Sequence, residues 1–173
     1  MITRRNFLKA GAAVAALSVV PNGFASILAK KEKAIGVQLY SVRDDLKTDF
    51  DGTMKALVDI GYKRMEAAGY RDGKFYGKSP AEMKKYLADL GARMVGSHTG
   101  SGLLAEGDTK GWDFWKKNAA DTAEVGCKWI VQAGYPSKDI KSLSDVKRLA
   151  DQFNKCGEIA KANGLRFAFH NHV

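Results

Sequence analysis

Five polar side chains recur near the carboxyl ends of short apolar segments in this sequence. They are Gln38, Glu66, His98, Gln132 and His170. Carboxylates and imidazoles move protons near neutral pH, and amides form hydrogen bonds with polar ligands. Side chains alternate along a strand, and each of these five falls on the set we assign inward. In a barrel of parallel strands the carboxyl ends meet at one mouth, so we expect the five side chains to converge there.

Each candidate also has a purely structural interpretation. Glu66 could form an ion pair with an Arg or Lys inside a barrel, and glutamines often fill such interiors with hydrogen bonds. His98 lies at a strand end among small residues, in Gly-Ser-His-Thr-Gly, which favours a role in a site. His170 and His172 are two residues apart on one strand, so both imidazoles could face a metal ion.

The elements that must position these residues repeat along the chain. An apolar strand, a loop and an amphipathic helix are followed each time by a glycine, and these glycines are Gly61, Gly91, Gly126 and Gly164. Strict strand–helix alternation indicates a parallel sheet covered by helices, either an open doubly wound sheet or a closed barrel. The even repeat and the lack of a glycine-rich dinucleotide motif favour the barrel. A whole barrel needs about 250 residues. We therefore predict an α/β fold of TIM-barrel type, truncated after about five strands.

The expected elements can be placed by pattern. Strands are predicted over residues 34–41, 63–69, 92–99, 128–134 and 165–172, and the first helix over 50–60. The second helix begins at Ser79-Pro80, because Ser79 and Glu82 form a capping box. Apolar residues at helical spacing mark the third and fourth helices. These residues are Trp112, Trp115, Ala119 and Ala123, then Val146, Leu149, Phe153, Cys156 and Ala160.

The first 25 residues are of a different kind. Arg4-Arg5-Asn6-Phe7-Leu8-Lys9 precedes a short apolar run and a small-residue site at Gly23-Phe24-Ala25, which is typical of a twin-arginine export signal. We predict a signal peptide over residues 1–25, a barrel portion over 26–173, and a periplasmic or exported protein without a stable membrane anchor after cleavage. Cleavage would lower the net charge from +9 to +6. The remaining lysines are scattered, so no nucleic-acid partner is inferred.

Two cysteines, Cys127 and Cys156, remain after the signal. In an oxidising compartment they could form a disulfide. Cys156 lies on the apolar side of its helix, which favours two buried, unpaired thiols instead.

The chain resembles the sugar phosphate isomerase/epimerase family, which has a xylose isomerase-like TIM barrel. The segments that carry the resemblance are Ile35-Gly36-Val37-Gln38-Leu39-Tyr40-Ser41-Val42-Arg43, Ile60-Gly61-Tyr62 with Glu66, Ser97-His98, and Phe169-His170-Asn171-His172. The ordered set is typical of the exported branch. The resemblance implies a divalent metal (Mn²⁺, Mg²⁺, Co²⁺ or Zn²⁺), a carbohydrate or polyol substrate, and proton transfer at a carbon beside a carbonyl.

The resemblance also implies roles for individual residues. Glu66 and His98 would be catalytic, and His170 and His172 would contribute to metal binding, with the main ligands expected beyond residue 173. The resemblance implies that Gln38, Tyr40, Arg43 and His170 bind the substrate, and strand alternation adds Gln132 to this set. We expect the chain by itself to be an incomplete fragment without catalytic turnover, and to self-associate through unpaired edge strands.

Two alternatives from other classes remain. One is a carbohydrate-binding half-barrel without catalysis, which would use the Tyr40, Gln38 and Gln132 side chains and no metal. The other is a metal-dependent hydrolase or lyase on the same barrel, including DNA-repair endonucleases. The export signal argues against DNA repair.

Overall fold

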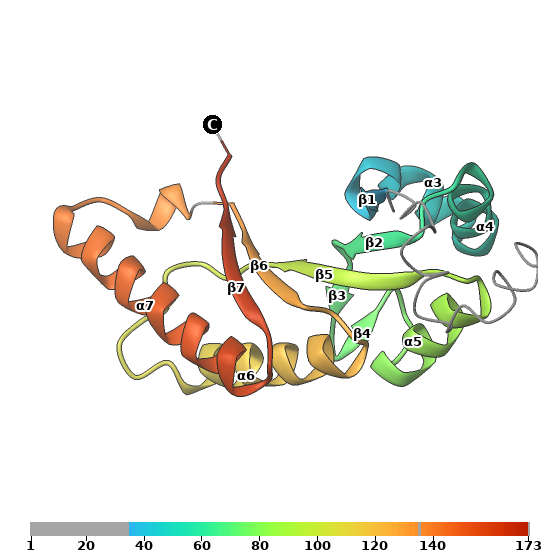
Figure 1. The fold of residues 1–173 in the computed structure, drawn as a ribbon. Helices are drawn as coiled ribbons and strands as arrows, with labels where there is room; N and C mark the ends of the chain where they lie inside the picture. Colours follow the sequence, from blue (N-terminus) through green and yellow to red (C-terminus); the bar gives the residue numbers. More distant parts are fainter. Residues whose placement is uncertain (1–34, 135, 173) are drawn as a thin grey trace, which may run out of the picture. The chain divides into compact units, whose positions relative to one another are not determined.

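The protein is described by a computed structural model that covers residues 35–134 and 136–172. Its centre is a parallel sheet of five strands in the order β1-β2-β5-β6-β7. The strands are β1 (Gly36–Gln38), β2 (Arg64–Ala67), β5 (Arg93–Thr99), β6 (Trp129–Ala133) and β7 (Arg166–His170). Adjacent strands in this order follow one another in the chain, apart from the small hairpin after β2 (Figure 1). The predicted parallel sheet is confirmed, and its five strands form part of a barrel.

Helices follow the strands as the repeat predicts. They are α3 (Arg43–Thr48), α4 (Phe50–Ile60), α5 (Pro80–Asp89), α6 (Thr109–Glu124) and α7 (Leu143–Ala162), with short 3₁₀ turns η1 (Leu39–Val42) and η2 (Ser137–Asp139). Helices α5, α6 and α7 each pack against the strand that follows them, β5, β6 and β7 (Figure 1). Among the described residues, no helix is both long and apolar enough to cross a membrane.

Local capping explains where the helices begin and end. The capping box of α5 is present, with the Ser79 hydroxyl accepting from Glu82 N–H and the Glu82 carboxylate accepting from Ser79 N–H. The four glycines of the repeat all have positive φ, from 69° to 115°. Only glycine adopts this conformation at little cost, so it ends each helix and starts the next strand.

The first strand is shorter than predicted. It ends at Gln38, and the chain continues through η1 directly into α3, which the sequence pattern does not predict. Asp44 and Asp45 lie in the first turn of α3, where carboxylates are favoured by the helix dipole. The early turn takes Tyr40 out of strand geometry and leaves it exposed.

A two-stranded antiparallel hairpin follows β2 and is also absent from the expected elements. It consists of β3 (Tyr70–Arg71) and β4 (Lys74–Phe75). Its turn residues Asp72 and Gly73 both have positive φ, 51° and 75°, which is the geometry that Asp-Gly favours in tight hairpins. The Asp-Gly pair is the sequence signal that could have revealed it.

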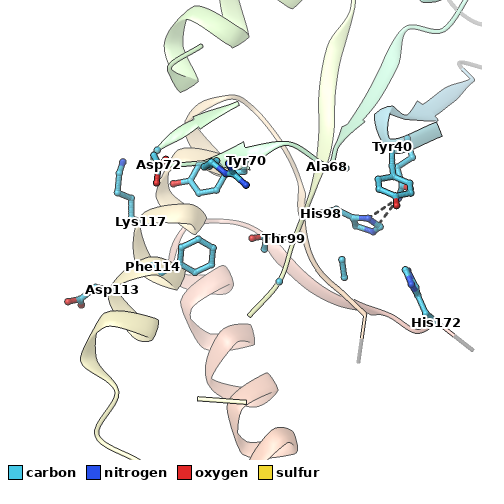
Figure 2. Close-up of a pocket in the computed structure, with 15 residues that line it drawn as sticks. Tyr40, Ala68, Tyr70, Asp72, His98, Thr99, Asp113, Phe114, Lys117 and His172 are labelled. Carbon is cyan, nitrogen blue, oxygen red and sulfur yellow. Dashed lines mark hydrogen bonds between the residues drawn. The ribbon is translucent and has the colours of Figure 1, made fainter. Parts of the chain in front are cut away.

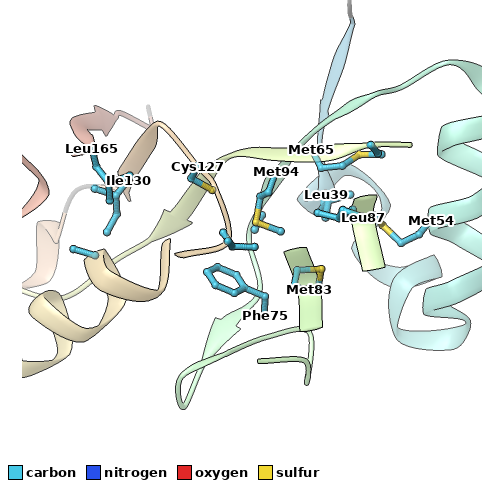
Figure 3. Close-up of a cluster of buried hydrophobic side chains, with 14 of the residues drawn as sticks. Leu39, Met54, Met65, Phe75, Met83, Leu87, Met94, Cys127, Ile130 and Leu165 are labelled. Carbon is cyan, nitrogen blue, oxygen red and sulfur yellow. The ribbon is translucent and has the colours of Figure 1, made fainter. Parts of the chain in front are cut away.

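The hydrophobic core lies between the sheet and its helices (Figure 3). Met65 and Met94 from the strands pack among Leu39, Met54 and Leu87, all at most 1% exposed. The helix patterns are confirmed except at Val146, which is 44% exposed. Cys127 and Cys156 are buried and unpaired, and burial raises the pKa of each thiol to about 12. A thiol of this kind carries almost no thiolate at neutral pH and behaves as a small apolar residue.

Candidate functional site

Glu66, His98 and Gln38 form one hydrogen-bonded cluster at the carboxyl end of the sheet. The three residues come from β2, β5 and β1, which are neighbours in the sheet. Glu66 Oε1 lies 3.1 Å from His98 Nε2, and Gln38 Nε2 lies 2.8 Å from Glu66 Oε1 and 2.9 Å from His98 Nδ1. Among the described residues, Glu66 forms no ion pair with an Arg or Lys. The carboxylate and imidazole predicted from the sequence therefore lie in contact.

The contacts of Gln38 favour one tautomer of the His98 ring. One amide hydrogen of Gln38 is donated to the Glu66 carboxylate, and the amide nitrogen lies 2.9 Å from His98 Nδ1 and 3.4 Å from His98 Nε2. The shorter distance favours Nδ1 as the acceptor, and a neutral ring that accepts at Nδ1 holds its proton on Nε2. That N–H faces the Glu66 carboxylate, and it also lies 3.2 Å from His170 Nδ1.

The glycine at position 96 leaves space for the Glu66 side chain in this cluster. Gly96 is the register partner of Glu66 across β2 and β5, and the register shifts between Met65 and Glu66. A Cβ at Gly96 would lie 3.4 Å from Glu66 Cγ, so the Glu66 side chain lies directly over the bare backbone. Glycine within a strand often marks such a close approach.

Burial lowers the pKa of His98 below its usual value. The Glu66 carboxylate opposes this effect, whereas the charges of His170 and His172 lower the pKa further. The His98 side chain is 8% exposed and that of Glu66 is 31% exposed. His98 is therefore mainly neutral at pH 7.

His170 joins the cluster, and His172 continues the row of imidazoles beyond the strand. The His170 ring lies 4.8 Å from the His98 ring and 4.7 Å from the His172 ring, edge to face in both pairs. Within residues 35–134 and 136–172, no group of three His, Cys, Asp or Glu side chains is arranged to hold a metal ion. These residues therefore do not fit a metal centre by themselves.

Two residues of the cluster, Gln38 and His98, line a cavity of about 860 Å³. Gln38, Tyr40, His98 and His172 line one end, and Thr99 lies between that end and a second one (Figure 2). Tyr40 is 55% exposed, so part of its ring can contact a ligand. Arg43 lies outside this cavity: its guanidinium stacks over the Tyr40 ring at 4.5 Å and contacts Asp44.

Gln132 does not lie with the other predicted site residues, so its expected position was wrong. In the register, His98 pairs with Val131 and Thr99 pairs with Gln132, which puts Gln132 on the opposite face of the sheet. It shares that face with Ile130 and is 2% exposed. Its side-chain amide accepts from Ser101 N–H and donates to Ser101 O, so it holds the loop that follows β5.

The second end of the cavity contains residues that sequence analysis missed. Tyr70 of the hairpin donates its hydroxyl to Asp121 of α6 at 2.6 Å, and Lys117 donates to the same carboxylate. Phe114 and Asp113 of α6 also line this end (Figure 2). These residues lie on a hairpin and a helix rather than at strand ends, so strand periodicity could not identify them.

Comparison with known proteins identifies the family. Residues 54–173 match the model of the family described as xylose isomerase-like TIM barrel, and residues 1–21 match the twin-arginine translocation pathway signal sequence. The signal marks the chain for export by that route. It lies outside the described residues, as does the predicted cleavage site. The comparison with curated proteins found no match.

Solved structures agree with the family match. A sugar phosphate isomerase/epimerase from Parabacteroides distasonis is 33% identical, with a TM-score of 0.73 over 84% of this chain and 53% of that one. A second such protein from the same organism is 30% identical, with a TM-score of 0.68 over 81% of this chain and 55% of that one.

A zinc-bound structure of the IOLI protein shares the fold. It is 17% identical, with a TM-score of 0.51 over 73% of this chain and 46% of that one. This chain thus spans about half the length of these solved relatives. The family match, the fold and the identity to two solved members lead to one conclusion: the chain belongs to the xylose isomerase-like TIM barrel family.

Proposed function

We propose that this protein takes part in the isomerisation or epimerisation of a sugar or polyol by proton transfer at a carbon beside a carbonyl. The observation that carries the proposal is the contact between the Glu66 carboxylate and the ring of His98, which lines a cavity of about 860 Å³. A base and a hydrogen-bond donor that lie side by side can act on adjacent atoms of one substrate. The two Parabacteroides relatives, both described as sugar phosphate isomerase/epimerases, support the same reaction class.

The proposed step follows from the protonation states of the pair. Glu66 accepts the proton from the carbon, the C–H electron pair forms the carbon–carbon double bond of an enediolate, and the π pair of the carbonyl moves to its oxygen. That oxygen accepts a hydrogen bond from His98 Nε2–H, which turns to it from the Glu66 carboxylate. A neutral imidazole suits this role because a donor of matched pKa stabilises the forming enediolate. Gln38 holds both partners in orientation through its two amide hydrogens.

A divalent metal is a separate part of the proposal. The family resemblance implies one, but the described residues do not form a site for it, so the step above does not use it. His170 and His172 are the side chains we propose as partial ligands. Metal content of the protein purified without chelator, with His170→Ala and His172→Ala as comparisons, tests this role. Unchanged content in both variants would contradict it.

Exchange of a carbon-bound hydrogen with solvent deuterium is the direct test of the acid–base step. The protein is incubated in D₂O with D-fructose, D-glucose, D-galactose or D-xylose, and deuterium in the sugar is measured by mass spectrometry. The assay reads only the proton-abstraction step at Glu66, which does not require the net turnover that we expect the chain by itself to lack. We expect exchange on at least one sugar, and at least a hundredfold loss in Glu66→Gln, because removing a general base costs about 10²–10⁴ in rate. Glu124→Gln, an exposed change on α6, is the matched control.

The results separate the proposed enzyme from the alternative of a binding protein. Exchange that persists in Glu66→Gln would contradict the assignment of the base. Sugar binding without any exchange would favour the carbohydrate-binding alternative.

A further inference from the structure

The cavity extends well past the Glu66–His98 cluster. Its second end is formed by the β3–β4 hairpin and by α6, which contribute Tyr70, Phe114 and Lys117 (Figure 2). Ligand pockets for drug-sized molecules measure about 300–1,000 Å³. At about 860 Å³, the cavity has room for more than one sugar ring.

The second end is held in a fixed arrangement. The Tyr70 hydroxyl donates to Asp121 at 2.6 Å, and Lys117 Nζ lies 2.8 and 3.1 Å from the two oxygens of the same carboxylate. Asp121 is buried, which strengthens these contacts. The Tyr70 ring also packs on Phe75 at 5.0 Å and meets Phe114 edge to face at 6.3 Å. Two aromatic rings are thereby positioned before any ligand binds.

The charges at this end do not favour a phosphate. Arg71 and Lys117 are the cations that line it, and Asp72 and Asp113 are the anions. Lys117 is already paired with Asp121. A phosphate site needs cationic side chains that are not already paired with anions. Among the described lining residues of this end, the cations do not outnumber the anions, so a phosphate would not be favoured.

Its exposed apolar surface is aromatic. Phe114 is 37% exposed and lies on the cavity wall next to the half-buried Tyr70. The C–H faces of a sugar ring are apolar, while its rim carries hydroxyls. Such a ring packs against an aromatic face and forms hydrogen bonds at its edge with groups such as Asp113 and Arg71.

From these observations we infer that the cavity holds a second subsite, at Tyr70 and Phe114, for the second ring of a neutral glycoside. The inference rests on the proposed function, because the first ring would lie at Glu66 and His98. It narrows the substrate class from any sugar to an uncharged disaccharide or similar glycoside. A phosphorylated monosaccharide would leave the aromatic end empty.

Calorimetric titration of the full chain with matched sugar pairs tests the subsite. The pairs are D-glucose with cellobiose, D-galactose with lactose and D-xylose with xylobiose, and D-glucose 6-phosphate is the charged probe. We expect the disaccharide of at least one pair to bind about tenfold more tightly than its monosaccharide, as one aromatic contact allows. Phe114→Ala should abolish the preference and leave monosaccharide affinity unchanged.

Two further variants keep the result interpretable. Phe114→Leu retains apolar volume but has no flat face, so it should also lose the preference while its thermal melt stays close to that of the native protein. Phe169→Ala removes an aromatic ring of comparable exposure, 41%, that does not line the cavity, and should change neither affinity.

The possible outcomes distinguish the subsite from the function on which it rests. Equal affinities within every pair, or a preference that survives Phe114→Ala, would overturn the subsite and leave the proposed function intact. Tighter binding of D-glucose 6-phosphate than of D-glucose would overturn the neutral substrate class. Failure of every sugar to bind would overturn both.

Discussion

Among single residues, the proposed chemistry depends on the neutral His98 ring and the Glu66 carboxylate beside it. Burial lowers the pKa of His98, Glu66 raises it, and His170 and His172 lower it. The Glu66 carboxylate and the two histidines therefore shift the pKa of His98 in opposite directions. Substitutions of Glu66 and His170 should accordingly move that pKa in opposite directions.

NMR titration of the His98 Cε1–H resonance tests these signs. We expect a pKa below 6.5 in the native protein, a lower one in Glu66→Gln because a negative charge is lost, and a higher one in His170→Ala because a positive charge is lost. Glu124→Gln should leave it unchanged. Movement in the same direction for Glu66→Gln and His170→Ala would contradict the arrangement.

The same pKa sets a pH dependence of stability. The unfolded His98 has the ordinary pKa near 6.5, and the folded one lies lower. Above the unfolded value both states are neutral and His98 contributes nothing. As the pH falls below it, the unfolded state binds the proton first, so stability decreases until the folded pKa is passed. His98→Asn should flatten this part of the pH profile in urea denaturation, and an unchanged slope would contradict the buried neutral ring.

Among the elements, the turn of the β3–β4 hairpin requires a glycine, whereas a glycine inside helix α7 can be replaced. Gly73 has a φ of 75°, and a Cβ there would lie 2.9 Å from Lys117 Cε. Gly157 lies within α7, and a Cβ at this position would meet nothing within 4 Å. The first site needs glycine and the second does not.

Two alanine substitutions should therefore change stability in opposite directions. Gly73→Ala should destabilise the protein by about 1–2 kcal/mol, the cost of a left-handed conformation. Gly157→Ala should stabilise it by about 0.5–1 kcal/mol, the helix preference for alanine. Chemical denaturation measures both. Equal effects would contradict the hairpin turn geometry.

The elements also show how far the sequence alone could lead. Glycine spacing and apolar periodicity predicted the five strands and the helices after them, because both patterns report local backbone geometry. They placed Gln38, Glu66, His98 and His170 together correctly. They failed for Gln132, because its strand is apolar on both faces and either alternation fits the pattern. The aromatic end of the cavity depends on contacts between a hairpin and a distant helix, which no local pattern encodes.

For the chain as a whole, the two edge strands of the described sheet predict association. Strands β1 and β7 each have one neighbour within the described residues, and unpaired edges recruit further strands. Sedimentation of residues 26–173 should show dimers or larger species. Ile35→Lys, beside β1, should reduce them, whereas Ile60→Lys at the end of α4 should not. Both residues are exposed. A monodisperse monomer would contradict this expectation.

Export is the other prediction for the whole chain. The signal match over residues 1–21 includes the Arg4-Arg5 pair, which we expect the export machinery to require. Replacing both with Lys keeps the charge and should hold the protein in the cytoplasm on cell fractionation. Lys9→Arg, which leaves the pair intact, is the control. Full export of the double variant would show that another signal is used.

The proposed function requires a sugar to bind against the Glu66–His98 pair, and the His98 resonance reports this contact. Each of the six neutral sugars of the calorimetric pairs is added to the native protein while the Cε1–H signals of His98, His170 and His172 are followed. We predict that at least one sugar shifts the His98 signal with saturation, and that Glu66→Gln weakens the binding. Saturable sugar binding that leaves the His98 signal unmoved would contradict a site at this pair.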